Sequence, residues 1–328
     1  MLFIDSPDTD PYFNLALEEY IFEHMDRSER YLMLWQNENT IVVGVHQNTA
    51  QEINAAYVRE HGIRVVRRLS GGGAVYHDKG NLNYTIVADR SDYADFNFRG
   101  FVLPVIDTLK QFGIEASFSG RNDVLINGKK FSGNAQYVRH GRILHHGCIM
   151  LDSDLETVTN ALQVREIKYR SKGIPSVRSR MTTINSETSR PVSMTAFRNA
   201  LVDSIRHHEA SFSRYTLTPE DYEKINRLKA DRYETWDWNY GTSPAYDVCK
   251  EAKFDAGLVT AFLSVDGGRI ASVRFYGDFF SEENPRELEE AMRGIPLDEN
   301  LRSRLEALHV GRYMSGMTAD DLARLLQE

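Results

Sequence analysis

The sequence predicts an α+β fold: a large domain on a mostly antiparallel mixed sheet, followed by a small α+β C-terminal accessory domain. Short runs of β-branched and aromatic residues, with only occasional helices between them, fill the first part of the chain. From about residue 190 the pattern becomes helical, and two more strands with helices follow an aromatic segment at 236–244. We therefore expect one domain over 1–246 and a second over 247–328.

The elements of the first half are marked by caps and by periodicity. Asp10 is expected to cap a helix that begins at Pro11, because proline suits the first helical position. Phe13, Leu17 and Ile21 recur every four residues, so this helix buries one face. The same criteria predict strands at 31–35 and 41–46, a helix at 54–61, strands at 63–68, 74–77 and 82–88, and a helix at 101–112 that ends at Gly113.

The second half begins with hairpins. Asn127-Gly128 predicts a tight turn between extended segments at 124–126 and 130–131, and residues 132–134 are expected to turn again. The remaining predictions are a hairpin of 138–139 with 143–151, helices at 193–210 and 219–229, an extended segment at 236–244, a hairpin of 257–265 with 269–275, and helices at 285–293, 301–308 and 318–327.

Composition restricts the class of protein. With 328 residues the chain can hold one large and one small domain. A formal charge of −8 argues against a general nucleic-acid binder, although local basic segments exist. Two cysteines, Cys148 and Cys249, cannot form a disulfide framework, and no apolar run reaches membrane-spanning length. Because the first residues also lack a basic leader, we expect a cytoplasmic protein with no membrane and no nucleic-acid partner.

The segment 67–78 contains three successive glycines between a basic pair and a His-Asp pair. A glycine cluster often forms a plain hairpin turn, here between the strands at 63–68 and 74–77. It can also let backbone N–H groups approach an anion closely. The glycines are flanked by basic and polar residues that a plain turn does not require: Arg67, Arg68, Ser70 and His77. The sequence therefore favours an anion-binding loop.

Three other segments combine glycine with unusual polar residues. Residues 120–123 could be a surface turn or part of a pocket. In 128–135, one member of the pair Lys129-Lys130 could point inward while the other is solvated, although two exposed lysines are the commoner arrangement. In 171–180, basic residues spaced by Gly, Ser and Pro suit either a loop that closes on phosphate or a solvated linker.

Together these motifs resemble the lipoate–protein ligases of the two-domain bacterial type. The resemblance covers most of 1–245 and, more loosely, the C-terminal part; it is carried by segments 67–78 with Gly80-Asn81, 120–123, 128–135, 145–147, 171–180 and 238–244. It implies a biotin/lipoate ligase-like catalytic domain over 1–246, which binds lipoate and ATP, and an accessory domain over 247–328.

The resemblance also implies a two-step reaction for lipoate salvage. Lipoate and ATP, with Mg²⁺, would give lipoyl-adenylate and pyrophosphate. The lipoyl group would then pass to a lysine of a lipoyl-domain acceptor, either the glycine-cleavage H protein or an acyltransferase subunit of a 2-oxoacid dehydrogenase. Both steps build negative charge on phosphate and carbonyl oxygens, which cations in a closed pocket stabilise far better than in water.

By the family pattern Lys130 is the catalytic lysine, because it directly precedes the Phe-Ser-Gly-Asn-Ala run. Arg68 and Ser70 would hold phosphate together with the N–H groups of Gly72 and Gly73. The other implied roles are adenine contacts from the backbone of Ala74, Val75 and Tyr76 with His77 at that edge; pocket polar groups at Asn81 and Asp123, the latter also holding Mg²⁺; a lipoyl-tail contact at His146; and ATP phosphate contacts at Lys172, Arg178 and Arg180.

Other activities on this fold remain open. A transferase that works through a cysteine thioester needs an activated thiolate, but 118–127 contains no cysteine, and Cys148 is expected to be a small core residue of an apolar strand. A cysteine-independent lipoyl or octanoyl transferase is the alternative that we keep. A biotin–protein ligase would carry a different adenylate loop, and a mere lipoate-binding module would not need Lys130, Asp123 and the basic segment 171–180 together.

Overall fold

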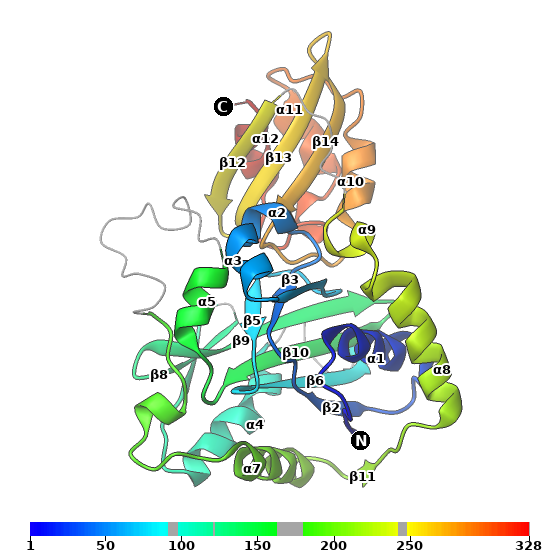
Figure 1. Cartoon of the computed structure of the whole chain (residues 1–328). Helices are drawn as coiled ribbons and strands as arrows, with labels where there is room; N and C mark the ends of the chain where they lie inside the picture. The colour runs from blue at the N-terminus through cyan, green and yellow to red at the C-terminus, as the bar shows by residue number, and fades with distance from the viewer. Residues whose placement is uncertain (91–97, 121, 163–179, 242–247, 328) are drawn as a thin grey trace.

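The computed structural model describes residues 1–90, 98–120, 122–162, 180–241 and 248–327 (Figure 1). The largest sheet in these residues has eight strands, in the spatial order β11 (Ser213–Arg214), β1 (Leu2–Asp5), β2 (Tyr31–Trp35), β6 (Asn81–Asp89), β10 (Arg142–Met150), β9 (Lys129–Arg139), β8 (Asp123–Ile126) and β7 (Ser117–Ser119). Only the β11–β1 and β1–β2 pairs are parallel. The predicted class, a mostly antiparallel mixed sheet with helices, is confirmed.

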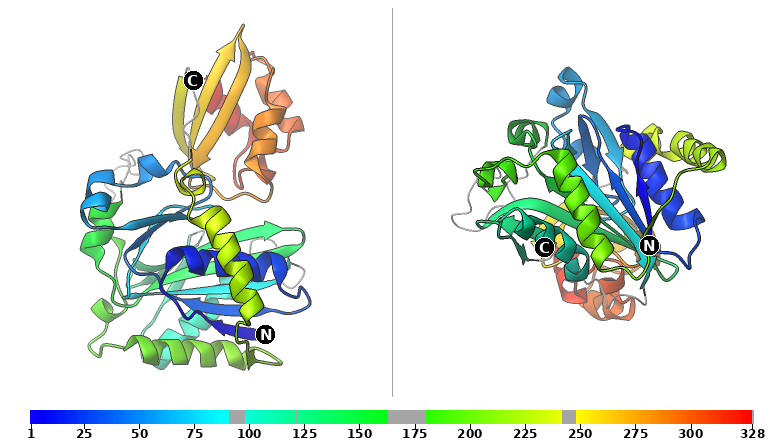
Figure 2. Two further views of the ribbon diagram at one scale, coloured as in Figure 1. Left: turned by 45° about the vertical axis from the view of Figure 1, so that its right-hand side comes forward. Right: turned by 90° about the horizontal axis from the view of Figure 1, so that it is seen from below.

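Helices cover both faces of this sheet (Figures 1 and 2). Successive side chains of a strand point to opposite faces, so Leu32 and Leu34 pack toward α4 (Phe98–Gln111) and α7 (Met194–His207). Tyr31, Met33 and Trp35 pack on the other face, toward α1 (Pro11–His24) and α8 (Pro219–Leu228), which continues as a π-helical turn η4 (Lys229–Tyr233). Shorter helical pieces lie at α2 (Thr49–Glu52), α3 (Ala55–Glu60), α5 (Leu155–Ala161) and η3 (Asn185–Glu187).

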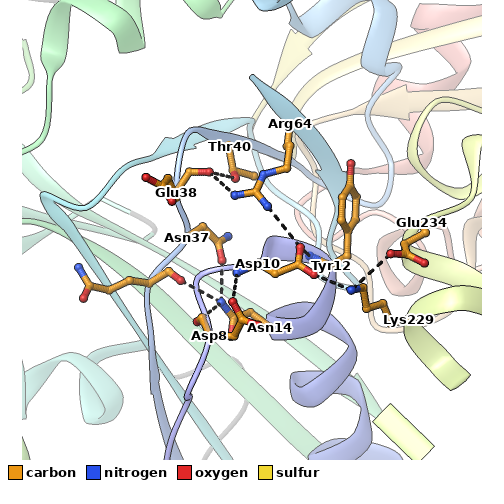
Figure 3. Close-up of polar contacts among 11 residues, drawn as sticks. Asp8, Asp10, Tyr12, Asn14, Asn37, Glu38, Thr40, Arg64, Lys229 and Glu234 are labelled. Atoms are coloured by element: carbon orange, nitrogen blue, oxygen red, sulfur yellow. Dashed lines mark hydrogen bonds and ion pairs between the residues drawn. The ribbon is translucent and has the colours of Figure 1, made fainter. Parts of the chain in front are cut away.

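The start of α1 follows the sequence prediction. The Asp10 side chain accepts a hydrogen bond from the Tyr12 N–H at 3.2 Å, and Pro11 occupies the first turn. The same carboxylate pairs with Arg64 at 3.5 Å and with Lys229 at 2.7 Å (Figure 3). This cap therefore ties α1 to the strand that enters the glycine segment and to the turn after α8.

A three-stranded sheet carries the glycine segment. Its order is β4 (Arg64–Arg67), β3 (Thr40–Val43) and β5 (Val75–His77), with β3 parallel to β4 and antiparallel to β5. The two strands that flank the glycines therefore pair with β3 and not with each other. The plain hairpin interpretation is wrong, because the loop must cross from one edge of this sheet to the other.

The C-terminal part has its own sheet and its own core. Strands β12 (Val248–Phe254), β13 (Gly257–Asp266) and β14 (Arg269–Gly277) form an antiparallel sheet. Its apolar face packs on α10 (Pro285–Ala291), α11 (Leu301–Ala307), η5 (Val310–Arg312) and α12 (Ala319–Gln327). The boundary at 246/247 borders 242–247, which lies outside the described residues, so it stays a prediction.

Two local predictions were wrong. The expected turn at 132–134 is instead continuous strand, because β9 pairs with β10 from Ser132 to Arg139. The expected extended segment at 236–244 begins with a helical turn, α9 (Trp236–Asn239), in which the Thr235 hydroxyl accepts from the Trp238 N–H. Within the described part of the chain, no helix has the length and apolar character needed to cross a membrane.

Candidate active site

The Arg68 guanidinium holds the glycine loop, residues 70–74, in place. Its Nε donates to the Ser70 Oγ at 3.0 Å, and its Nη2 donates to the carbonyl oxygens of Gly71 (2.7 Å) and Gly73 (2.9 Å). Its Nη1 donates to the Val42 carbonyl of β3 at 3.2 Å. These contacts take four of the five N–H donors of arginine. Burial lowers the pKa of Arg68 to about 10, so the side chain remains cationic at neutral pH.

A hydrogen-bonded chain continues from this loop into the large sheet. Since Ser70 Oγ accepts from Arg68, its own O–H can donate to His146 Nε2, 2.7 Å away. The His146 Nδ1 lies 2.8 Å from the Glu18 carboxylate, which also accepts from the Thr85 hydroxyl at 2.7 Å. All four side chains after Arg68 are buried, which means that the loop and the sheet are fixed relative to one another.

The loop needs glycine because other backbone approaches it closely. A Cβ on Gly71 would collide with the Phe279 carbonyl oxygen, and Gly72 has φ +90°, where an L side chain is strained. The Gly72 N–H itself donates to the Phe279 oxygen at 3.4 Å. In this structure, the C-terminal part therefore lies directly on the predicted anion-binding backbone.

Phe279 and Phe280 anchor that contact. The Phe279 ring stacks on His46 with centroids 4.7 Å apart, and the hydroxyl of Ser281, two residues further on, lies 2.8 Å from His46 Nε2. Phe280 is buried against Phe98 of the large domain. A backbone bond from the Gly277 N–H to the His46 oxygen, at 2.8 Å, completes the interface.

Below the loop, one row of side chains crosses five neighbouring strands of the large sheet. The register pairs Trp35 with Asn83, Asn83 with Cys148, Cys148 with Gly133, and Gly133 with Asp123. Directly paired residues share a face, and adjacent strands lie about 4.8 Å apart, so the row spans roughly 19 Å. The row begins with the apolar Trp35 and the uncharged Asn83, and it ends with the carboxylate of Asp123.

A β-bulge directs Lys130 into this row. The pairing of β8 with β9 shifts between Val124 and Leu125, which leaves Phe131 without a partner. Because of the extra residue, Lys130 and Gly133 share a face although they are three positions apart: a Cβ on Gly133 would lie 3.0 Å from Lys130 Nζ. Lys130 Nζ pairs with Asp123 Oδ1 at 2.7 Å.

Lys129 points to the other side of the strand. Its Nζ lies 3.0 Å from a Glu187 carboxylate oxygen at an exposed position. The Asn127 and Thr182 side chains also donate to Glu187, and together these contacts lower the pKa of that carboxyl to about 2. The two adjacent lysines therefore occupy different environments.

A cavity of about 110 Å³ lies between the glycine loop and the sheet. Eight of the residues that the sequence marked line it: Arg68, Gly72, Gly73, Ala74, Val75, His77, Lys130 and His146. Leu15, Trp35, Val42 and Val75 make an apolar wall, while Lys130, Asn122 and Asn134 bring polar groups. Since ligand cavities are usually ~300–1,000 Å³, the site as seen is closed down.

The other site residues predicted from the sequence either lie beside the cavity or fall outside the described residues. Asn81 donates to Asn83 Oδ1 at 2.9 Å. The Tyr76 side chain faces away, toward Asn39, so only its backbone could meet a ligand. Arg180 adjoins Met181, which bridges to Lys130. Lys172 and Arg178 fall in 163–179, which the structure does not describe.

Sequence reasoning did not identify several of the residues that line the cavity. Trp35, Asn83 and Leu15 come from segments predicted only as strand or helix, and no sequence signal joins them to the glycine loop. Cys148 was expected in the core, but the register sets it beside Gly133, so it is half-buried on the cavity wall. Glu18 lies on the buried face of α1, where an acidic residue at an otherwise apolar position is the one available signal.

A magnesium ion would find a single carboxylate here. Asp123 is not one of the lining residues, but it pairs with Lys130, which is. The described residues contain no group of three or more His, Cys, Asp or Glu side chains that could hold a metal. Magnesium in phosphate-transfer sites often takes one or two carboxylates, with phosphate and water oxygens completing its shell. The donor set therefore fits an ion that arrives with a nucleotide rather than a resident metal.

Comparisons with known proteins define the family. The lipoyl protein ligase A/B catalytic domain matches residues 10–206, and the bacterial lipoate protein ligase C-terminus matches 243–326. The chain belongs to the lipoate–protein ligase family. It is 40% identical to lipoate-protein ligase LplJ of Bacillus subtilis over 330 aligned positions, covering 99% of this chain and all of that protein.

Solved structures agree with this assignment. A bipartite lipoate protein ligase from Thermoplasma acidophilum, studied with its E2 lipoyl domain, is 29% identical with a TM-score of 0.65, covering 75% of this chain and 98% of that one. A lipoate-protein ligase A bound with ATP is 26% identical with a TM-score of 0.64, covering 73% and 97%.

We predict that the buried histidines make stability fall in acid. Burial, with smaller effects of Arg68 and His146, lowers the pKa of His77 to about 3, and burial also lowers that of His145. Below about pH 6.5 the unfolded chain protonates both rings while the folded protein keeps them neutral, so stability is full above that pH and is lost as the pH falls; for His77 the loss continues to about pH 3.

Each ring should reduce the free energy of unfolding by up to about 1.4 kcal/mol per pH unit in that window. Urea unfolding at several pH values, with ¹⁵N NMR of the imidazoles, measures both effects. A His77 ring that titrates near its ordinary pKa in the folded protein would contradict the prediction.

Proposed function

We propose that this protein is an ATP-dependent lipoate–protein ligase that activates lipoate as lipoyl-adenylate and transfers the lipoyl group to a lysine of lipoyl-domain acceptors. One observation carries the proposal: Lys130, which pairs with Asp123, lines a cavity whose wall also includes the apolar side chains of Leu15, Trp35 and Val42. The family membership and an ATP-bound relative support it.

In the first step, a carboxylate oxygen of lipoate attacks the α-phosphorus of ATP, the bond to the β-phosphate bridge breaks, and pyrophosphate leaves. Lys130 would neutralise the carboxylate and the phosphate oxygens as charge builds on them. A unit-charge contact at 4 Å is worth about 4 kcal/mol at an effective dielectric near 20, against about 1 in water. Since the Lys130 side chain is still 35% exposed here, closure of the site over bound substrates would strengthen this interaction.

The glycine loop would supply the nucleotide side. The N–H groups of Gly72 and Gly73 would meet phosphate, and the backbone of Ala74, Val75 and Tyr76 would lie beside the adenine. Arg68 and Ser70 are occupied in holding the loop, so we assign them to its shape more than to direct phosphate contact. Asp123 would hold Mg²⁺ together with the phosphates, and the ion would neutralise their charge.

The closed cavity implies movement of the C-terminal part. The Gly72 N–H cannot bind phosphate while it donates to Phe279, and a cavity of about 110 Å³ cannot hold an acyl-adenylate. We therefore propose that Phe279 and Phe280 withdraw when substrates bind. Lys172, Arg178 and Arg180 would then meet the ATP phosphates from the segment that follows α5.

In the second step, the neutral amine of an acceptor lysine attacks the acyl carbonyl carbon and forms the amide bond. The bond from that carbon to the phosphate oxygen breaks, AMP leaves with the oxygen, and the proton lost by the amine passes to solvent. Lys130 would stabilise the carbonyl oxygen in this step too. The acceptors would be lipoyl domains such as the H protein and the acyltransferase subunits; the archaeal relative studied with its E2 lipoyl domain supports this class. The setting would be cytoplasmic lipoate salvage.

Exchange of label between pyrophosphate and ATP tests the first step. We expect lipoate-dependent exchange in the native protein and a loss of at least about a hundredfold in Lys130→Ala, because a preorganised charge at the reacting oxygens is removed. Lys129→Ala is the matched control and should retain exchange, since only an exposed ion pair is lost. No exchange in the native protein, or equal activity in the two variants, would contradict the proposal.

The pyrophosphate exchange also tests the cysteine-independent transferase, which should show none. A transferase that works through a cysteine thioester has a separate test. A thioester mechanism would need Cys148, the cysteine on the cavity wall, whose Sγ lies 3.6 Å from the Gly133 carbonyl. We expect Cys148→Ser to keep most of the exchange and transfer activity, because the serine hydroxyl fills a similar space. Complete loss of both activities in a folded variant would favour thioester chemistry instead.

A further inference from the structure

His77 is a buried imidazole on the cavity wall that uses only one of its two ring nitrogens. The residue is 3% exposed, and within the described part of the chain its Nε2 has no hydrogen-bond partner. Leaving a buried polar group unpaired carries a free-energy penalty, because the group has lost its water and gained no partner. Because His77 is among the residues that line the cavity, we look to the ligand for this missing partner.

Neighbouring amides determine which nitrogen carries the proton. The Nδ2 groups of Asn37 and Asn83 lie 3.3 and 3.4 Å from His77 Nδ1. The Asn37 oxygen already accepts from Asn14 Nδ2 at 3.0 Å, and Asn14 in turn is oriented by backbone carbonyls (Figure 3). The Asn83 oxygen likewise accepts from Asn81 at 2.9 Å.

Both amides can therefore offer only N–H groups to His77. Nδ1 must be the acceptor, and the proton of the neutral ring must reside on Nε2. The lowered pKa keeps the ring in this neutral form at physiological pH. His77 thus presents a fixed N–H donor that the protein leaves unused.

This donor stands at the end of the cavity where Trp35 lies. The His77 ring meets the Trp35 indole edge-on, with centroids 5.9 Å apart, and Leu15 and Val42 belong to the same wall. Asn83, which contacts His77, is two strands away from Gly133, or about 10 Å. Lys130 lies beside Gly133, so the charged end and the His77 end of the cavity are opposite.

An acid whose carboxylate lies at Lys130 would place the far end of its chain against His77. A saturated chain would expel water from the Nε2–H and offer no acceptor in return. Divalent sulfur is a weak acceptor that packs well in apolar surroundings. A five-membered cyclic disulfide would therefore match this end of the cavity, whereas a hydrocarbon of the same shape would leave the N–H unpaired.

We propose that His77 is a specificity-determining residue: its Nε2–H donates to a ring sulfur of the substrate, so that the cavity prefers a cyclic disulfide to a hydrocarbon of equal shape. The inference rests on the proposed function, because it takes the carboxylate to lie at Lys130. It reassigns His77 from the adenine edge, where the sequence resemblance put it, to the acyl end.

The test compares lipoate with 5-cyclopentylpentanoate, which has the same chain and a ring without sulfur. Calorimetry would measure the affinity of both acids for the native protein, for His77→Met, and for Leu103→Met, which introduces the same side chain at an exposed position of α4 outside the cavity lining. We expect the lipoate preference of the native protein to exceed that of His77→Met by about three- to tenfold. Leu103→Met should keep the preference.

An equal preference in the native protein and His77→Met would overturn the inference, and partial misfolding cancels because both acids are measured on one preparation. If His77→Met does not fold, the ¹⁵N signal of Nε2 in the native protein decides: it should shift with lipoate but not with the carbocycle, and equal shifts would overturn the inference. If the protein binds lipoate in preference to the carbocycle but catalyses no pyrophosphate exchange, the proposed ligase function is contradicted and the role of His77 is not.

Discussion

The site depends on the buried guanidinium of Arg68. Four of its N–H groups are used to hold the glycine loop to β3 and to itself, and a loop of this shape would otherwise bury carbonyl oxygens without donors. Through Ser70, the same interaction reaches His146 and Glu18 in the body of the large domain. The loop and the sheet that face each other across the cavity are thus parts of one hydrogen-bonded unit.

The sheet supplies what the loop cannot, which is a change of polarity along the cavity. Its register brings Trp35, Asn83, Cys148, Gly133 and Asp123 into one row across five strands. The bulge in β9 adds Lys130 at the acidic end. A long acid can therefore enter in only one sense, with its charge beside the lysine and its tail beside the tryptophan, before any catalytic step is considered.

The sequence was sufficient for the fold class and for local features whose cause is local. Asp10-Pro11 begins a helix as predicted, because a cap and a proline act within one turn. The His140-Gly141 hairpin between β9 and β10 is confirmed for the same reason. Lys130 was preferred to Lys129 on the family resemblance. The physical reason that the two lysines have different environments is the β-bulge in β9, which the spacing of residues in the sequence does not reveal.

The missed features are non-local. The strands beside the triple glycine both pair with β3, a choice made by long-range packing that turn residues cannot encode. Trp35, Asn83 and Cys148 become neighbours only through the register of three strands far apart in sequence. The acceptor role of His77 Nδ1 depends on amides at 37 and 83 whose own orientations depend on other residues.

We propose that one cavity binds the whole acyl-adenylate, with its carbonyl at Lys130, its ring at His77 and its phosphate at the glycine loop. A crystal structure with a nonhydrolysable sulfamoyl analogue of lipoyl-adenylate tests this most directly. It should show the acyl carbonyl within hydrogen-bond distance of Lys130 Nζ, the ring between Trp35 and His77, and the Phe279 carbonyl displaced from Gly72. An analogue bound elsewhere, with Lys130 still paired to Asp123 and Phe279 still on the loop, would contradict it.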